Sequence, residues 1–279
     1  MPIAQIRNLD LHYEILGDRG PFVVLQPGGR RAGTSIRPLA QKIAEAGCRV
    51  VVYDRRNTGA STVRIEGDSE NDVWADDLHA LLGHLDAAPA YIGGSSSGCR
   101  LALILALRHP ADVRGLLLWR VTGGAHAAGH LANQYYTSHI AAAQQGGMAA
   151  VCAMEHWSEV IKANPRSRDT LMAMDPADFI ARMERWRQSF GAGADHAVIG
   201  VSAAELRSLT MPACVIPGMD PVHPLPAGQA AHRLIPNAEY AEIVTQQRAT
   251  LDEAFADWDA REGLLAATFI DFLRRQQRR

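Results

Sequence analysis

The chain has 279 residues, of which 47% are hydrophobic, enough for a substantial core in one large domain or two small ones. Its formal net charge is only −2, so no basic field is available to attract nucleic acid or an anionic membrane surface. The sequence contains no run of about 20 apolar residues, which excludes a membrane-spanning helix. These features favour a globular protein whose partner is a small molecule, and they leave a homodimer open.

The four cysteines, Cys48, Cys99, Cys152 and Cys214, lie far apart and form no CxxC pair. This spacing argues against a zinc knuckle and against a disulfide framework. The first residues alternate like a strand, and they lack the basic and apolar regions of a secretory signal peptide. We therefore expect a cytoplasmic protein, and the sequence implies no metal and no organic cofactor.

Two short strands, at residues 6–8 and 11–16, are expected to open the chain as an edge hairpin. Apolar runs of about five residues follow, each stopped by Gly, Pro or Asp, and such runs are typical of a parallel sheet covered on both faces. Helical patterns over residues 36–46, 71–85 and 99–108 alternate with these runs. With right-handed crossovers, this order predicts an α/β fold with an open, doubly wound and mostly parallel sheet.

The alternation breaks between about residues 122 and 208, where helical spacing continues without a convincing strand. A helical insertion at the carboxyl end of a strand would lie over the edge of the sheet where ligands bind in such folds. We therefore predict a helical lid over residues 123–205 and a core from residues 1–122 and 206–279; a separate helical domain is the alternative. Most aromatic residues of this segment are expected in a core, with Trp157 and Trp186 as candidate substrate contacts.

The segment "GSSSG", residues 94–98, follows an apolar strand and precedes a helical pattern. This is the setting that a GxSxG nucleophile turn requires. The turn is so sharp that the serine backbone is strained, and the flanking glycines remove side chains that would collide there. We therefore predict that Ser96 is raised above the sheet with its hydroxyl exposed and that the N-terminus of the next helix points at it.

Together with this turn, three further segments give the chain a resemblance to the α/β-hydrolase family over nearly its whole length. The "QPGG" segment stands where the family has its His-Gly oxyanion loop, with Pro27 in place of His, and "DRRNTGAS" is similar to the family's DxRGxGxS turn. The resemblance implies that the backbone amides of Gly29 and Ser97 face a developing oxyanion, beside Gly28. "VIPGMD" is similar to the strand and turn that deliver the catalytic acid, here Asp220.

The expected base of this family is a histidine in the loop after the last strand. That strand is predicted at residues 238–244, and the loop that follows it contains no histidine. His223, three residues after Asp220, is the leading candidate for a relocated base, and His126 and His130 follow it. A misplaced last strand would be a further explanation, although the last histidine of the chain is His232.

Arg120, at the end of the strand after the GxSxG helix, is expected to face the pocket, where it would pair with a substrate carboxylate or with Asp220. His126 is a second candidate substrate contact. The leading hypothesis is hydrolysis of an ester, lactone or related carbonyl bond of a small apolar molecule by a serine nucleophile. A cofactor-free lyase, isomerase or cyclase that uses the oxyanion pocket without acylation is one alternative. A non-catalytic protein that binds a small ligand is the other.

Overall fold

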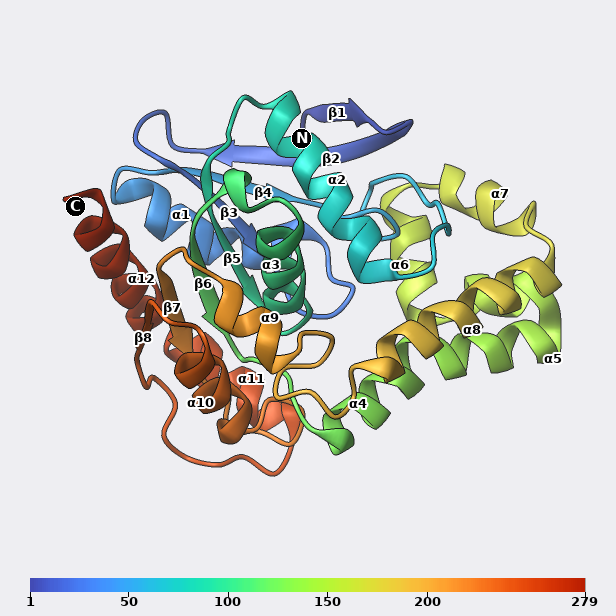
Figure 1. The fold of residues 1–279 in the computed structure, drawn as a ribbon. Helices are drawn as coiled ribbons and strands as arrows, with labels where there is room; N and C mark the ends of the chain where they lie inside the picture. The colour runs from blue at the N-terminus through green and yellow to red at the C-terminus, as the bar shows by residue number, and fades with distance from the viewer. Residues whose placement is uncertain (279) are drawn as a thin grey trace.

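The computed structural model describes residues 1–278, and its centre is one eight-stranded sheet in the order β1-β2-β4-β3-β5-β6-β7-β8 (Figure 1). Strand β2 pairs antiparallel with β1 and β4, and the pairs from β4 to β8 are parallel. The strands are β1 (Ile3–Ile6), β2 (Leu9–Leu16), β3 (Phe22–Gln26), β4 (Arg49–Tyr53), β5 (Ala90–Ser95), β6 (Val113–Trp119), β7 (Ala213–Ile216) and β8 (Ala238–Tyr240). The predicted fold class, a doubly wound and mostly parallel sheet, is confirmed.

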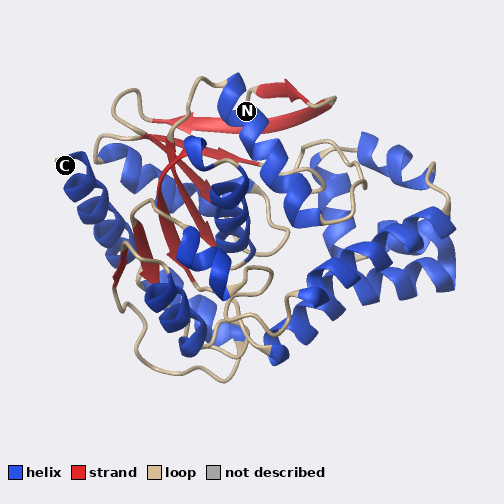
Figure 2. Ribbon diagram, in the orientation of Figure 1, coloured by secondary structure: helices blue, strands red, loops and turns tan. Residues whose placement is uncertain are grey.

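Helices cover both faces of this sheet (Figure 2). The α-helices are α1 (Arg37–Glu45), α2 (Glu70–His84), α3 (Ser97–Arg108), α4 (Ala125–Ala132), α5 (Ser138–Ala153), α6 (Glu155–Ala163), α7 (Arg166–Met172), α8 (Pro176–Ala192), α9 (Ala203–Ser208), α10 (Leu225–Leu234), α11 (Leu251–Ala260) and α12 (Glu262–Gln277). Short turns are the 3₁₀ segments η1 (Gly33–Ile36) and η2 (Pro110–Asp112) and the π-helical turn η3 (Asn133–Thr137). None of the helices in residues 1–278 is long and apolar enough to cross a membrane.

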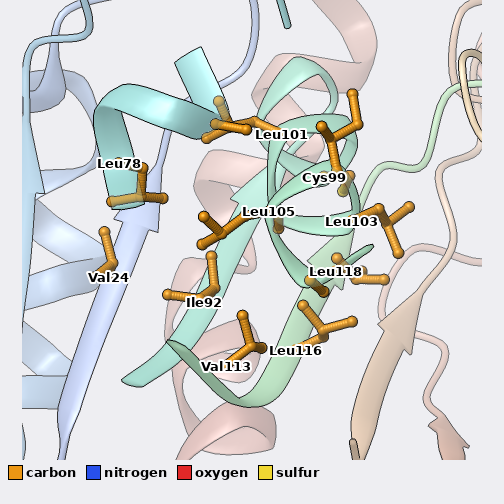
Figure 3. Packing of buried hydrophobic residues seen from close by; sticks show 14 of the residues in the cluster. Val24, Leu78, Ile92, Cys99, Leu101, Leu103, Leu105, Val113, Leu116 and Leu118 are labelled. Atoms are coloured by element: carbon orange, nitrogen blue, oxygen red, sulfur yellow. The ribbon is translucent and has the colours of Figure 1, made fainter. Parts of the chain in front are cut away.

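The two faces of the sheet carry separate hydrophobic layers. On one face, Leu78 of α2 and Leu105 of α3 pack over Val24 and Ile92 of the central strands (Figure 3). On the other face, residues of α1, α11 and α12 pack over the alternate side chains of the same strands. Strands β3, β5 and β7 are therefore buried along their whole length, as their uniformly apolar sequences predicted.

Two strand boundaries differ from the sequence expectation. The first strand ends at Ile6, because Arg7 and Asn8 have φ values of 48° and 60°, in the left-handed region, and form the hairpin turn. The last strand ends at Tyr240 instead of residue 244. Ile243 and Val244 are still buried, but they pack as loop residues against the layer that contains α12. The apolar sequence thus predicted the burial of these residues correctly, but it was wrong in placing them in a hydrogen-bonded strand.

Helices α4 to α8 follow β6 and project to one side of the sheet (Figure 1). They share a hydrophobic cluster of their own, in which Trp157 and Trp186 are almost completely buried. The cluster also includes Val63 and Val222, which belong to loops outside these helices. The helical segment thus packs on the sheet-bearing part of the chain near the carboxyl ends of the strands. The boundaries of the lid at residues 123 and 205 stay a prediction.

Candidate active site

Ser96 occupies the sharp turn between β5 and α3. Its backbone has φ 55° and ψ −113°, outside the regions that residues other than glycine normally adopt. A side-chain carbon on Gly94 would lie 2.1 Å from the carbonyl carbon of Gly98. A side-chain carbon on Gly98 would lie 2.6 Å from the backbone carbonyl oxygen of Gln26. The two glycines therefore allow the turn to close this tightly, and Ser96 lines a cavity at the edge of the sheet.

His223 lies directly against this serine, although 127 residues separate them in the chain. Its Nε2 is 2.9 Å from Ser96 Oγ, and its Nδ1 is 2.8 Å and 2.9 Å from the two carboxylate oxygens of Asp220. The carboxylate also accepts hydrogen bonds from the backbone amides of Val222 and His223, at 3.0 Å and 2.9 Å. The acid and the imidazole thus come from one short loop after β7, and the carboxylate itself fixes the shape of that loop.

The hydrogen bonds define the tautomer of His223. Because Asp220 accepts, Nδ1 carries the proton, and Nε2 is left to accept from the Ser96 hydroxyl. Burial lowers the pKa of His223 to about 4 although the bond to Asp220 opposes this, and the charge of Arg120 contributes to the lowering. Burial alone would raise the pKa of Asp220, but the hydrogen bond from His223 and the charges around it hold that pKa below its usual value.

Arg120 is buried beside this pair and has a φ of 55°. Its Nη2 lies 3.5 Å from Asp220 and 3.3 Å from His223 Nδ1. Because Nδ1 already donates its proton to Asp220, Arg120 makes no hydrogen bond to it; the positive charge of the guanidinium instead opposes a second proton on the imidazole. Of the two partners that the sequence left open for Arg120, Asp220 is therefore within reach. The buried Nε of Arg120 has no hydrogen-bond partner within the described residues 1–278.

The predicted oxyanion loop lies against Ser96. A side-chain carbon on Gly28 would come within 3.1 Å of Ser96 Cβ, and Gly29 lines the same cavity with a φ of 58°. The Gly29 carbonyl accepts hydrogen bonds from Arg55 Nη2 at 2.5 Å and from Ser97 Oγ at 2.8 Å. These bonds turn the carbonyl of Gly29 toward the protein. No sequence pattern pointed to this contact between Arg55 and the glycine loop.

The cavity has a volume of about 530 Å³ and is bounded by the glycine loop, the His223 loop, the lid helices and α11. Two lid histidines, His139 and His156, line it, although their positions on α5 and α6 gave no sequence signal for this. Burial lowers the pKa of His139 to about 3, with a contribution from the charge of Arg30, and it also lowers the pKa of His156. Both rings are therefore neutral hydrogen-bonding groups near pH 7.

Three of the predicted substrate contacts lie outside the lining of this cavity. Trp157 and Trp186 belong to the hydrophobic cluster of the lid, and Trp186 Nε1 donates to the Gly67 carbonyl at 3.0 Å. Both indole rings are buried in that cluster, where their large apolar surfaces fill the interior of the helical layer. His126 and His130 line a separate shallow hollow with Asp252, so the structure does not bring them to Ser96.

One group of side chains in residues 1–278 has the spacing of metal ligands. His79, His109 and Asp112 offer ligand atoms within 4.8 Å of one another, and the two imidazoles stack with their centroids 3.9 Å apart. His79 lies within α2, His109 directly follows α3 and Asp112 ends η2, and all three lie outside the lining of the Ser96 cavity. A metal bound there would not reach the serine.

Comparison with known proteins bears on the fold that carries this site. Residues 21–137 match the family model described as alpha/beta hydrolase fold, and the chain has the α/β-hydrolase fold. A hydrolase of Bacillus subtilis strain 168, named as the uncharacterized hydrolase YraK, is 35% identical over 115 residues. These residues are 40% of this chain and 41% of that protein, so the match covers about two fifths of the relative's length.

Solved structures align over almost the whole chain at lower identity. An enol-lactonase from Burkholderia xenovorans LB400 has a TM-score of 0.64 and 21% identity, covering 96% of this chain and 99% of that one. A thermophilic esterase from Thermogutta terrifontis has a TM-score of 0.66 and 20% identity, covering 96% and 94%. At this level of identity the likeness establishes the shared fold.

Proposed function

We propose that this chain is a serine hydrolase that cleaves an ester or lactone bond of a small molecule. The observation that carries the proposal is the 2.9 Å contact between Ser96 Oγ and His223 Nε2, with His223 Nδ1 bonded to Asp220. A neutral imidazole at hydrogen-bond distance from a strained, cavity-facing serine is the arrangement that nucleophilic acyl transfer requires. Relatives and structural neighbours that are named as hydrolases, lactonases and esterases support the reaction class.

In the first half of the reaction, Ser96 Oγ attacks the carbonyl carbon while His223 Nε2 takes the hydroxyl proton. The carbonyl oxygen becomes an oxyanion, and the amide hydrogens of Gly29 and Ser97 donate to it. His223 then gives its proton to the leaving alkoxide, and an acyl-serine remains. For a lactone, the leaving hydroxyl stays attached to the same acyl group.

In the second half, a water molecule attacks the acyl-serine and gives one proton to His223 Nε2. The tetrahedral intermediate collapses, Ser96 regains that proton, and a carboxylic acid leaves. Asp220 keeps its negative charge throughout, holds the Nδ1 tautomer and stabilises the imidazolium that forms in each half. The Asp220 loop thus carries both the base and the group that orients it.

The test is a panel of aryl esters and lactones assayed with the wild type, Ser96→Ala and His223→Ala. Each substitution is expected to lower kcat/KM by about 10³-fold or more, because each removes a group on which the others depend. His126→Ala is the matched control: this histidine is exposed and lies outside the cavity, so its loss should change kcat/KM less than about twofold. Full turnover by the Ser96 variant would refute the nucleophilic role.

A second measurement separates acylation from the non-hydrolytic chemistries. Ser96 Oγ is expected to attack the phosphorus of a fluorophosphonate and displace fluoride to solvent, while His223 Nε2 takes the hydroxyl proton, so that the serine carries one phosphonyl group, detected by intact mass and mapped to residue 96. The Ser96→Ala protein should remain unmodified. A wild-type protein that is not labelled, while it retains a bound small molecule through purification, would favour a binding protein or a catalyst that never acylates its serine.

A further inference from the structure

Two arginines meet in the Ser96 cavity at the ring of Phe255, on α11. The guanidinium carbon of Arg120 lies 4.4 Å from the ring centroid, and that of Arg31 lies 5.7 Å from it. All three residues line the cavity together with Ser96. Contact with an aromatic face favours a cation, so the ring stabilises both guanidiniums where they are.

The positive charge at this place is only partly compensated by the protein. Arg120 shares Asp220 with His223 and with two backbone amides, and its buried Nε has no hydrogen-bond partner in the part of the chain that the structure describes. Arg31 makes no ion pair or hydrogen bond with any residue between 1 and 278 that the structure describes. The two arginines also repel each other, since the charge of Arg31 contributes to lowering the pKa of Arg120, an effect that follows mainly from burial.

The third arginine of the cavity differs in this respect. Arg30 is paired with the buried carboxylate of Glu70 at 3.0 Å and 3.1 Å, and Tyr136 also donates to that carboxylate at 3.1 Å. Its charge is therefore compensated inside the protein. The acidic residues that line the cavity, Glu155 and Glu159, are exposed on α6, and Glu159 lies 4.0 Å from Lys162. The excess positive charge is therefore at Arg31 and Arg120.

We propose that Arg31 and Arg120 bind a carboxylate of the substrate, so that this enzyme acts on esters or lactones that carry a free carboxylate near the reacting carbonyl. The inference rests on the proposed hydrolase function. A carboxylate fits better than a phosphate dianion, because Asp220 already compensates part of the charge and about one positive charge remains. The planar donors of a guanidinium match the two carboxylate oxygens. Phe255 offers an apolar surface for the carbons between the carboxylate and the ester.

The kinetic test compares two aryl esters of equal carbon number, 4-nitrophenyl hydrogen glutarate and 4-nitrophenyl pentanoate, each corrected for its uncatalysed hydrolysis. We expect kcat/KM of the wild type to favour the glutarate ester about tenfold or more, the effect of one partly screened ion pair. Arg31→Gln should remove most of this preference, because it lowers kcat/KM of the glutarate ester far more than kcat/KM of the pentanoate ester. Arg207→Gln, an exposed arginine on α9 outside the cavity, is the matched control and should leave the preference unchanged.

Arg31 is the diagnostic position because it touches neither His223 nor Asp220 in the structure. Arg120→Gln is expected to slow both esters, since Arg120 contacts the Asp220 carboxylate. An equal loss for both esters in Arg31→Gln, or a wild type that prefers the pentanoate ester, would overturn the carboxylate assignment.

A binding measurement keeps this inference separate from the hydrolase proposal. Calorimetric titration of Ser96→Ala should detect glutarate but not glutaramide, with weaker glutarate binding in 0.5 M NaCl and none in Ser96→Ala/Arg31→Glu. Binding of glutarate that depends on Arg31 would stand even if no ester were hydrolysed. Equal binding of the acid and the amide would reject the carboxylate subsite while leaving Ser96-dependent hydrolysis intact.

Discussion

Asp220 and His223 stand three residues apart, where related enzymes are expected to draw these groups from two different loops. A single loop with this three-residue separation is sufficient here, because the Asp220 carboxylate accepts hydrogen bonds from the amides of Val222 and His223 and also from the imidazole. The backbone bonds bend the loop so that the ring stands above its own acid, and Nε2 then faces Ser96. Gly218 contributes space, since a side-chain carbon there would lie 2.3 Å from His223 Cβ.

At neutral pH the Nε2 atom of His223 is unprotonated and can accept the serine proton directly. We therefore expect the acid limb of the pH profile of kcat/KM near pH 4. His223 accepts the Ser96 proton only when it is neutral, and burial lowers its pKa to about 4. Activity should therefore stay constant from about pH 7 to 5.5 and fall as the pH drops through 4. The measurement is the initial rate with a neutral aryl ester, after a brief jump from pH 7 to each assay pH. An acid limb at about pH 6.5 would contradict this account.

The neutral variant Arg120→Gln separates the contribution of charge from that of burial. Removal of the guanidinium charge beside His223 Nδ1 should move the acid limb to higher pH, because this charge opposes protonation of the ring. Arg31→Gln is the control, since Arg31 does not contact His223 in the structure. An acid limb that stays in place in Arg120→Gln would mean that burial alone sets the basicity of His223.

At the scale of elements, the turn between β5 and α3 couples the sheet to the site. Strand β5 is buried along all its residues and pairs with β3 and β6, so its last residue is fixed in space. Helix α3 begins at the next residue after Ser96 and packs against the same strands. The strained conformation of Ser96 persists because both flanking elements are held by the core.

Gly94→Ala is expected to displace this turn. Its new carbon would lie 2.1 Å from the Gly98 carbonyl carbon, which is backbone and cannot rotate away. We expect a loss of about 2 kcal/mol or more in the free energy of unfolding, measured in urea, and a fall in kcat/KM because Ser96 moves. Gly83→Ala is the matched control: this glycine of α2 has open space around it, so alanine should stabilise the helix by about 0.5–1 kcal/mol without changing activity. Unchanged stability and activity in Gly94→Ala would contradict the tight turn.

At the scale of the whole molecule, the lid and the sheet together bury ionisable groups that are neutral at pH 7. His139 in the lid and His223 over the sheet are 3% and 4% exposed. Burial lowers the pKa of His139 to about 3 and that of His223 to about 4, from 6.5 in an open chain. The unfolded chain therefore binds more protons than the folded one between pH 6.5 and 4. Stability that is present above pH 6.5 is lost as the pH falls toward the folded pKa values.

The expected slope is about 1.4 kcal/mol per pH unit for each such histidine. Urea unfolding at pH 7, 6 and 5 should show a free energy of unfolding that decreases with acidity. His139→Gln should make this dependence shallower by about that amount, because one protonation of the unfolded chain is removed. The exposed His84→Gln is the control and should keep the wild-type slope. A free energy of unfolding that is constant from pH 7 to 5 would contradict the lowered pKa values of the buried histidines.

The sequence by itself determined the sheet and the place of the serine turn. Both depend on short-range patterns: uniformly apolar runs between helical segments, and glycines at fixed offsets around Ser96, where only their backbone freedom permits the bend. The exact ends of β1 and β8 escaped such reasoning, because apolar residues such as Ile243 are buried in loops as well as in strands.

Only the tertiary structure decided what surrounds Ser96. The distance from its hydroxyl to His223 depends on how a loop docks 127 residues further along the chain. Likewise, His139 and Phe255 line the cavity while Trp157 fills the lid, and all three side chains lie on helices with similar apolar or aromatic character. Local sequence fixes what a residue can do chemically and which backbone shape it permits. Its neighbours across the chain are fixed by packing, because burial energy depends on the whole set of elements that close around them.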